Sequence, residues 1–262
     1  IKYSKPRTVE CMVKGERILL RVHSAMEGYR AESYETKEPE TLEWMRLFFK
    51  PGDVFYDIGA NVGLYSLYCA RVLKEKCVVY SFEPESLNFA SLNENISVNG
   101  LDRTIIACGF AVSDALSVDT FYLHPQEADG QAVRISAGAA MHAFGSTVDC
   151  LGKDFYSAHV QKTVGLAVDD LWGKWGFEFP SHLKIDVDGH EDKVLAGAAK
   201  ALSDARLKSI LVEISESKKE TDPIKRCLLA HGFRVYDDFK EHSRDLLKGT
   251  AYEDCVNTVF IR

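Results

Sequence analysis

The sequence contains no hydrophobic run long enough to cross a membrane. A membrane-spanning helix needs about 20 consecutive apolar residues, and no stretch of the 262 residues approaches that length. A secretory leader, in which basic, apolar and small residues follow one another, is also missing at the start. We therefore expect a soluble, cytoplasmic protein. Because the sequence starts at Ile1 rather than Met, we also expect that further domains can lie outside it.

Paired cysteines and an excess of basic residues are missing as well. The seven cysteines include no C-x-x-C pair, and their odd number fits poorly with a disulfide framework, so we expect reduced, buried thiols. The formal net charge of −7 opposes binding to a nucleic-acid backbone. No internal repeat or low-complexity segment is present. The hydrophobic content of 46% is instead typical of one large α/β domain with a packed core.

A glycine-rich turn between a strand and a helix is the first functional signal. The run Val54-Phe-Tyr-Asp-Ile58 is rich in β-branched and aromatic residues, which favours a buried strand, and helical spacing of apolar residues begins after Asn61. Gly59 and Gly63 flank the turn, where missing Cβ atoms permit close approach of a ligand or of a neighbouring element. A helix start also carries free N–H groups and a partial positive charge. The turn is therefore typical of a nucleotide-binding loop.

An acid at the end of the next strand indicates which part of the nucleotide is held. The apolar run from Cys77 to Phe82 predicts a second strand, and Glu83 follows it directly. If the two strands are neighbours, Glu83 can accept hydrogen bonds from both hydroxyls of a ribose. Enzymes that bind NAD share such an acid, but their loop reads G-x-G-x-x-G, which Gly59-Ala-Asn-Val-Gly63 does not match. The loop therefore disfavours a dinucleotide.

Three segments together resemble the signature of the FkbM-type methyltransferases: Asp57-Ile-Gly-Ala-Asn-Val-Gly63, Phe82-Glu83-Pro84 and Leu183-Lys-Ile-Asp-Val-Asp-Gly-His-Glu191. The similarity runs from about Glu38 to the end of the chain. It implies S-adenosylmethionine (SAM) as the cofactor and a class I Rossmann-like fold. The residues implied to bind the cofactor are Asp57, Gly59, Ala60, Asn61, Gly63, Glu83, Ser113 and Asp186. For Ser113, the implied contact is with the adenine, and a simple strand-ending turn is the alternative.

The order of the predicted elements fits that fold. A β-hairpin over residues 8–23, a polar segment over 24–37 and a helix that starts near Pro39 form an N-terminal extension, residues 1–50. The methyltransferase domain follows over residues 51–262. We expect an α/β three-layer sandwich with a seven-stranded, mostly parallel sheet, in which one strand, the last, is antiparallel. Residues 104–112 are predicted to form the third strand of this sheet.

Residues 114–168 are too many for a plain crossover between parallel strands. The segment combines strand-like stretches near residues 118–123 and 160–168 with a loop of small residues over 136–146. Long loops at the ligand face of such a sheet often carry specificity. We predict that this insertion contacts the substrate, with His142 and Phe144 as the leading candidates. A purely structural surface position is the alternative for each of them.

Acidic residues gather at the carboxyl ends of the predicted strands, where parallel sheets bind their ligands. Asp186 and Asp188 share a face if their strand continues, and Glu213 ends the next strand. The balancing cation can be the cofactor, a lysine or a metal. We expect no metal, and a Mg²⁺, Mn²⁺ or Ca²⁺ site made by these three acids is the lesser alternative. Asp188 and Glu191 equally fit a helix cap, and Lys184 can simply extend outward.

Methyl transfer to an alcohol requires in-line geometry and removal of a proton. We expect Asp186 to anchor the catalytic site. His190 stands where the family commonly has a small residue, so it is either a base specific to this branch or a solvent-facing turn residue.

The resemblance implies O-methylation of a sugar, a glycan or a natural product, hence a small-molecule or glycan partner and no nucleic acid or membrane. The alternatives are a protein or RNA methyltransferase, a non-catalytic SAM-binding or interaction domain of a longer protein, and an NAD(P)-dependent oxidoreductase.

Overall fold

The computed structural model describes residues 7–123, 127–128, 131–132, 137–140, 142–147, 154, 156–157, 159–215, 222–243, 248–249 and 255–262. Two residues of the predicted small-residue loop, Ser136 and Met141, lie outside the described residues. Within these ranges, no helix combines the length and the apolar character needed to cross a bilayer. The cysteines with described side chains are free thiols: Cys11, Cys69, Cys77, Cys108 and Cys227.

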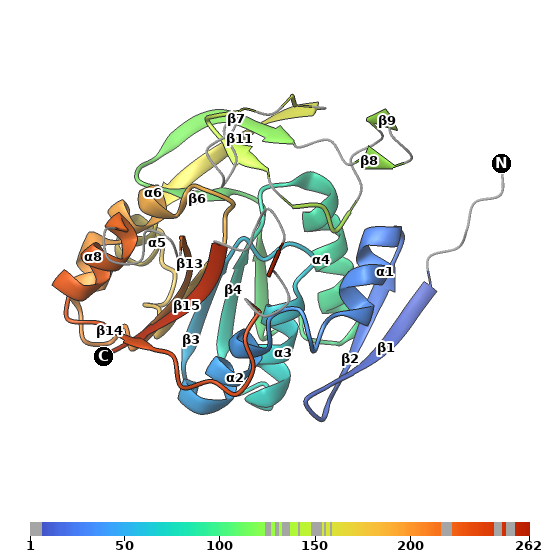
Figure 1. Ribbon diagram of the computed structural model, residues 1–262, viewed down its shortest axis with the longest axis horizontal. Helices are drawn as coiled ribbons and strands as arrows, with labels where there is room; N and C mark the ends of the chain where they lie inside the picture. Colours follow the sequence, from blue (N-terminus) through green and yellow to red (C-terminus); the bar gives the residue numbers. More distant parts are fainter. Residues whose placement is uncertain are drawn as a thin grey trace.

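A seven-stranded sheet forms the centre of the molecule (Figure 1). Its strand order is β14-β15-β13-β12-β3-β4-β5. Neighbouring strands are parallel except at β15, which is antiparallel to both β13 and β14. The predicted sheet with one antiparallel strand is therefore confirmed. Its strands are β3 (Val54–Ile58), β4 (Val78–Phe82), β5 (Ile105–Cys108), β12 (His182–Ile185), β13 (Ser209–Ser215), β14 (Arg234–Tyr236) and β15 (Cys255–Ile261).

Helices cover both faces of this sheet, because its central strands are apolar on both sides. Within β3, Phe55 packs into the hydrophobic cluster of the first helix layer, whereas Tyr56 and Ile58 pack into that of the second. The predicted three-layer sandwich is thus confirmed. The first layer contains α2 (Pro39–Phe48), α3 (Leu64–Val72) and α4 (Ser86–Val98). The second contains α5 (Val168–Lys174), α6 (Glu191–Ala196), α7 (Ala199–Ser203) and α8 (Pro223–Ala230).

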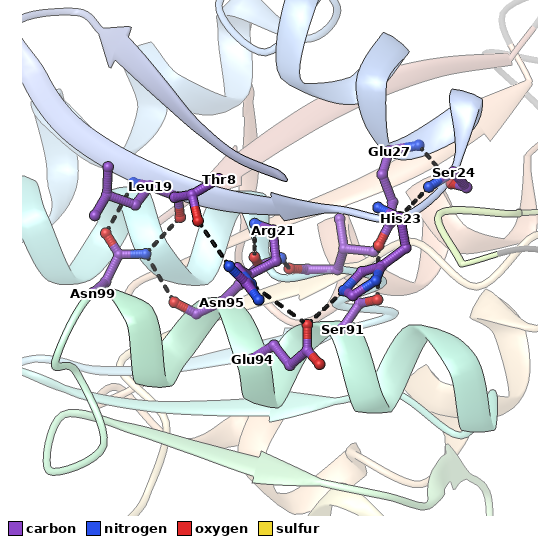
Figure 2. A network of polar contacts seen from close by, with 11 residues as sticks. Thr8, Leu19, Arg21, His23, Ser24, Glu27, Ser91, Glu94, Asn95 and Asn99 are labelled. Carbon is purple, nitrogen blue, oxygen red and sulfur yellow. Dashed lines mark hydrogen bonds and ion pairs between the residues drawn. The ribbon is translucent and has the colours of Figure 1, made fainter. Parts of the chain in front are cut away.

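The N-terminal extension contains the predicted hairpin, β1 (Arg7–Val13) and β2 (Glu16–Val22), and a helix that was not predicted. This helix, α1 (Ala25–Glu32), lies in the segment expected only to be polar. A capping box explains it. The Ser24 hydroxyl accepts a hydrogen bond from the Glu27 N–H, and the Glu27 carboxylate accepts one from the Ser24 N–H (Figure 2).

Two asparagine side chains, one in α4 and one directly after it, close the exposed edge of the hairpin (Figure 2). The Asn99 side chain accepts from the Leu19 N–H at 3.0 Å and donates to the Leu19 C=O at 2.7 Å. The Asn95 side chain accepts from the Arg21 N–H at 2.7 Å. Unpaired edge groups invite pairing with another chain. Helix α4 therefore takes the place of a third strand and fixes the hairpin beside the first helix layer.

The insertion builds a second sheet with the strand order β10-β7-β11-β6. Its strands β7 and β11 lie at the top of Figure 1. The prediction of a single strand over residues 104–112 is wrong, because the chain leaves the main sheet after Cys108 and continues in the second sheet. The strands of this region are β6 (Ala111–Ser113), β7 (Ser117–Leu123), β10 (Ala143–Phe144), β11 (His159–Ala167) and the separate pair β8 (Glu127–Ala128) and β9 (Gln131–Ala132).

Candidate functional site

A cavity of about 330 Å³ lies at the carboxyl ends of the central strands. Its volume falls in the range of small-molecule sites. The structure brings most of the predicted site residues to its wall. These are Gly59, Ala60, Asn61, Glu83, His142, Phe144, Asp186, Asp188, His190 and Glu213.

Close contacts with neighbouring protein atoms explain why both residues of the turn are glycine. Gly59 has a φ of 83°, and a Cβ atom there would lie 1.8 Å from the carbonyl oxygen of Asp186. Gly63 has a φ of 90°, and a Cβ atom there would lie 2.5 Å from a side-chain carbon of Leu92. Both positions therefore require glycine for their backbone conformation and for tight packing of strand and helix.

Glu83 is fixed beside this turn with its carboxylate at the cavity. Its side chain is buried, and its two oxygens accept hydrogen bonds from the N–H groups of Asn61 and Glu85, both at 2.8 Å. Burial raises the pKa of the Glu83 carboxyl to about 8. Each carboxylate oxygen keeps further lone-pair capacity. Glu83 can therefore still accept hydrogen bonds from two ribose hydroxyls.

Three residues predicted to bind the cofactor, Asp57, Gly63 and Ser113, lie behind the cavity wall rather than on it. Asp57 is completely buried and accepts a hydrogen bond from the Ser66 hydroxyl at 2.5 Å, while Ser66 also contacts the Ser81 hydroxyl at 2.6 Å. Burial raises the pKa of the Asp57 carboxyl. In this arrangement Asp57 supports the glycine turn from beneath, and its direct contact with a cofactor stays a prediction.

Lys184 does not extend outward, and this part of the prediction is wrong. Its side chain is 1% exposed, and its Nζ donates to the Asp186 carboxylate at 2.6 Å. The ammonium group also lies over the Tyr65 ring, 5.0 Å from the ring centre. Burial alone would lower the pKa of Lys184, but the charges of Asp186, Asp57 and Glu38 outweigh it and raise the pKa. Lys184 is therefore a cation that balances the acids at the carboxyl ends of the central strands, which we call the acidic rim.

His190 is held on the cavity wall by two neighbours. Its Nε2 atom lies 2.9 Å from the Ser113 hydroxyl, and its ring packs edge-on against Phe144 with 5.6 Å between the ring centres. Burial lowers the pKa of the His190 imidazole. A neutral ring held in one orientation is a suitable proton acceptor, so the structure keeps His190 as a candidate base.

Glu191 stabilises the turn between β12 and α6. Its carboxylate accepts hydrogen bonds from the N–H groups of Val187 and Gly189, both at 3.0 Å, around Asp188 with its φ of 55°. Burial raises the pKa of the Glu191 carboxyl to about 7. The residue that caps α6 is His190 and not Asp188, so the predicted cap is wrong, and Glu191 instead holds the backbone on both sides of Asp188. In the described part of the chain, no group of three or more His, Cys, Asp or Glu side chains is placed to hold a metal ion.

The described part of the insertion covers one end of the cavity. The Ala139 carbonyl accepts hydrogen bonds from the side-chain amides of Asn61, at 2.6 Å, and Asn88, at 3.1 Å. The Arg30 guanidinium of α1 donates to the Gly138 carbonyl at 2.7 Å. The insertion is thus tied both to the glycine turn and to the N-terminal extension.

His142 and Phe144 continue this cover as part of an aromatic wall. Both side chains are buried, and the His142 ring lies 5.9 Å from the Phe121 ring. Phe110 lines the same cavity. Because the Phe144 ring also packs against His190, this aromatic wall reaches the turn after β12 that carries Asp186 and Asp188.

Glu38 is a cavity residue that sequence reasoning missed. One of its oxygens accepts from Lys37 Nζ at 2.6 Å, and the Tyr65 hydroxyl lies next to the same carboxylate and helps to keep it ionised. Burial would raise the pKa of Glu38, but Lys37 and Lys184 lower it to about 2. The sequence signal was Pro39, which starts α2 and so places Glu38 at the helix terminus.

A buried Ser-His-Asp arrangement lies at the opposite end of the strands. The His182 ring contacts the Ser209 hydroxyl at 2.7 Å and the Asp53 carboxylate at 2.9 Å, and Trp44 donates to the same hydroxyl at 2.8 Å. Ser209 is 1% exposed and His182 is completely buried. No substrate can reach this hydroxyl, so the network is a stabilising element of the core.

The strand order, the glycine turn and the glutamate at the end of β4 define a class I methyltransferase with a Rossmann-like sheet. Comparison with known proteins agrees with this class. Residues 57–235, more than half of the chain, match the family model of the Methyltransferase FkbM domain. The chain belongs to this family of SAM-dependent methyltransferases, as the sequence motifs predicted. This family membership rejects the alternative of an NAD(P)-dependent oxidoreductase.

Several known proteins are similar to the chain. It is 28% identical over 197 residues to 31-O-demethyl-FK506 methyltransferase FkbM from Streptomyces tacrolimicus, covering 71% of this chain and 74% of that protein. It is 28% identical over 162 residues to the hexuronic acid methyltransferase AglP from Haloferax volcanii, covering 62% and 56%. The crystal structure of a methyltransferase FkbM from Methylobacillus flagellatus KT matches 90% of this chain and 54% of its own, with a TM-score of 0.50 and 15% identity. This last match supports the fold.

Proposed function

We propose that this chain transfers the methyl group of SAM to a hydroxyl of a sugar, a glycan or a natural-product small molecule. One observation carries the proposal. The Asn61 N–H of the glycine turn donates to the Glu83 carboxylate, and both residues line one cavity. Two relatives are named as methyltransferases of 31-O-demethyl-FK506 and of hexuronic acid, which supports a small-molecule or glycan acceptor.

The cavity offers a suitable group for each part of SAM. Phe110 and Val112 provide an apolar wall for the adenine, and Glu83 provides acceptors for the ribose hydroxyls. Glu38 lines the cavity and its carboxylate is ionised, because Lys37 and Lys184 lower its pKa to about 2, so it suits the ammonium group at the other end of the cofactor.

The chemistry requires an acceptor oxygen aligned with the reactive carbon and a route for the hydroxyl proton. Bound SAM supplies a methyl group on a positively charged sulfur, and the carbon–sulfur bond breaks as the new carbon–oxygen bond forms. His190 is the better candidate to take the proton, because its lowered pKa keeps it neutral and Ser113 orients its ring. Asp186 is better suited as an anchor, because the Lys184 ammonium already neutralises its charge.

Calorimetric titration tests the proposal directly. The chain is titrated with SAM, with its demethylated product S-adenosylhomocysteine and with NAD, each with and without EDTA. We expect both SAM compounds to bind in the presence of EDTA, and we expect no NAD binding. The surface variant Glu32→Gln, which changes an exposed residue of α1, serves as the control and should bind like the unchanged chain. Binding of NAD, or no binding of either SAM compound, would refute the proposed function.

A further inference from the structure

One face of α6 is directed at the end of strand β6, and the two elements pack against each other (Figure 1). His190, Lys193 and Gly197 stand at helical spacing, so they share this face. A Cβ atom at Gly197 would lie 2.2 Å from the Ser113 carbonyl oxygen. Glycine at this position therefore allows α6 to approach β6 closely enough for side-chain contacts between them.

A row of polar contacts runs from α6 through the end of β6 to the candidate base. The Lys193 ammonium donates to one oxygen of the Asp114 carboxylate at 2.9 Å. The Ser113 hydroxyl lies 3.2 Å from the other oxygen of that carboxylate and 2.9 Å from Nε2 of His190. We call Ser113 and Asp114 the relay pair. The relay pair thus connects a lysine to the His190 ring.

The donors and acceptors in this row fix the direction of each hydrogen bond. The hydrogen bond from Lys193 lowers the pKa of the Asp114 carboxyl, so the carboxylate is ionised at neutral pH and can only accept. The single proton of the Ser113 hydroxyl is therefore directed at Asp114, and the Ser113 oxygen offers only lone pairs to His190. Nε2 of neutral His190 must then carry the ring proton and donate it to Ser113. The relay pair selects one of the two tautomers.

The other ring nitrogen of His190, Nδ1, is then the proton acceptor. Among the described residues, none forms a hydrogen bond with Nδ1, and the side chain does not cap α6 although His190 is the N-cap residue. His190 lines the cavity. In a neutral imidazole, the nitrogen without the proton is the one that accepts. Nδ1 is therefore the ring atom that a ligand in the cavity can use.

The insertion fixes the His190 ring from a second side. Phe144 packs edge-on against it, and a Cβ atom at Gly165 of β11 would lie 2.9 Å from a ring carbon of Phe144. Glycine at position 165 thus leaves room for Phe144. Because Ser113 belongs to β6 and Phe144 to β10, both contacts come from the second sheet. A described part of the insertion therefore holds the candidate base in place.

The charged groups that act on His190 come from two elements. Burial lowers the pKa of the imidazole most, Asp192 and Asp114 raise it, and Lys193 lowers it. Asp192 and Lys193 belong to α6, Asp114 follows β6, and Phe144 of β10 carries no charge. The Asp192 carboxylate accepts from the Lys193 N–H and does not contact Ser113. Asp192 therefore acts through its charge, whereas Asp114 also acts through the Ser113 hydroxyl.

We propose that the relay pair keeps the proton of neutral His190 on Nε2 and thereby leaves Nδ1 to take the proton of the acceptor hydroxyl. Nδ1 takes this proton as the acceptor oxygen bonds to the methyl carbon, and the electron pair of the broken carbon–sulfur bond stays on sulfur. The imidazolium then donates from Nε2 to Ser113, and Ser113 donates to Asp114. Ser113 and Asp114 are positioning residues in this arrangement, and Ser113 is not a contact of the adenine. The inference rests on the proposed methyl transfer.

The test reads the tautomer of His190 directly. The full chain, labelled with heavy nitrogen in its histidines, is measured by long-range proton–nitrogen NMR correlation from pH 5 to 9, and His190→Ala identifies the His190 signals by their loss. We expect neutral His190 to carry its proton on Nε2. In Asp114→Ala the Ser113 hydroxyl is released to donate to Nε2, so the share of the Nδ1-protonated tautomer should rise about fivefold, the effect of one hydrogen bond. The matched control Asp192→Asn also removes one negative charge near the ring, and it should lower the pKa of His190 without changing the tautomer.

Ser113→Ala separates the relay from the adenine contact that the family resemblance implies for Ser113. We expect the pKa of His190 to fall in this variant, because the imidazolium loses the acceptor of its Nε2 proton. The affinity for S-adenosylhomocysteine, measured by calorimetry, should stay within about twofold of that of the unchanged chain, because Ser113 does not line the cavity.

Several results would overturn the inference. These are a proton on Nδ1 of neutral His190 in the unchanged chain, the same tautomer shares in Asp114→Ala as in the unchanged chain, or an equal change of tautomer in the Asp192→Asn control. A loss of product affinity of about tenfold or more in Ser113→Ala would also overturn it, because Ser113 would then contact the cofactor. Failure of the unchanged chain to bind S-adenosylhomocysteine is a separate outcome, which refutes the proposed function whatever the tautomer.

Discussion

Glu83→Gln should weaken SAM binding and remove most of its pH dependence. In the free protein, burial raises the pKa of the Glu83 carboxyl to about 8, so at pH 7 the carboxyl is mostly protonated. Ribose hydroxyls that donate to this group, and the positive charge of the cofactor, favour its ionised form. Binding therefore lowers the pKa and releases a proton.

The sign of the effect follows from this difference. A carboxyl whose pKa is lower in the complex gives an affinity that increases as the pH rises between the two pKa values and is constant above about pH 8. Each pH unit in that window changes the affinity by up to about tenfold. Glutamine keeps the size of the side chain but has no charge. The loss of one charge-assisted hydrogen bond, about 2 kcal/mol, corresponds to roughly 30-fold weaker binding.

Calorimetry of S-adenosylhomocysteine and SAM from pH 6 to 9, in two buffers with different ionisation enthalpies, measures both the affinity and the number of protons released. We expect release of close to one proton at pH 7 in the unchanged chain and much less in the Gln variant. Other titrating groups, such as His190, remain in both proteins and cancel in the comparison. Equal pH slopes in the two proteins, or an unchanged affinity in the variant, would refute the role assigned to Glu83.

Two further substitutions test the acidic rim and the candidate base. Lys184→Met should lower the free energy of unfolding by about 3 kcal/mol in denaturant titrations, because it leaves the Asp186 carboxylate without its cation and removes one of the two cations near buried Glu38. The control Lys174→Met removes the exposed lysine of the Lys174–Asp170 ion pair in α5 and should cost less than about 1 kcal/mol. Equal effects of the two changes would count against the assignment. His190→Ala should lower methyl transfer about 100-fold and remove the fall in turnover on the acid side of about pH 6.5, where a histidine with a lowered pKa titrates, with product affinity retained. Unchanged turnover at pH 6 to 9 would remove His190 as the base.

The sequence predicted most of the central sheet and the position of the glycine turn beside Glu83, for a local physical reason. Val54–Ile58 and the glycine turn that follows it form a continuous pattern in which hydrophobicity, turn residues and helix start all agree. Glu83 ends the neighbouring apolar run in the same way. Such features depend on residues close together in the chain, and the structure places them as expected around one cavity.

The features that sequence reasoning missed depend on distant contacts or on weak local signals. Helix α1 has little apolar periodicity, and the Ser24–Glu27 capping box is the sequence signal that could have predicted it. Lys184 was expected at the surface because lysine rarely lies buried without a partner. Asp186 is close to it in sequence, but its other carboxylate neighbours, Asp57 and Glu38, come from distant segments. The placement of His142 depends on the second sheet, whose strands pair across long stretches of sequence. No local pattern carries that information.

The contact between Arg30 and the Gly138 carbonyl has a consequence for how this enzyme can diversify. Arg30 lies outside the segment that matches the family model, whereas Gly138 lies inside it. A change in the length or path of the insertion during evolution would leave Arg30 of α1 without the carbonyl that it now contacts. The two regions should therefore coevolve. A chimera that imports the insertion of a relative would need to import that relative's opening residues as well.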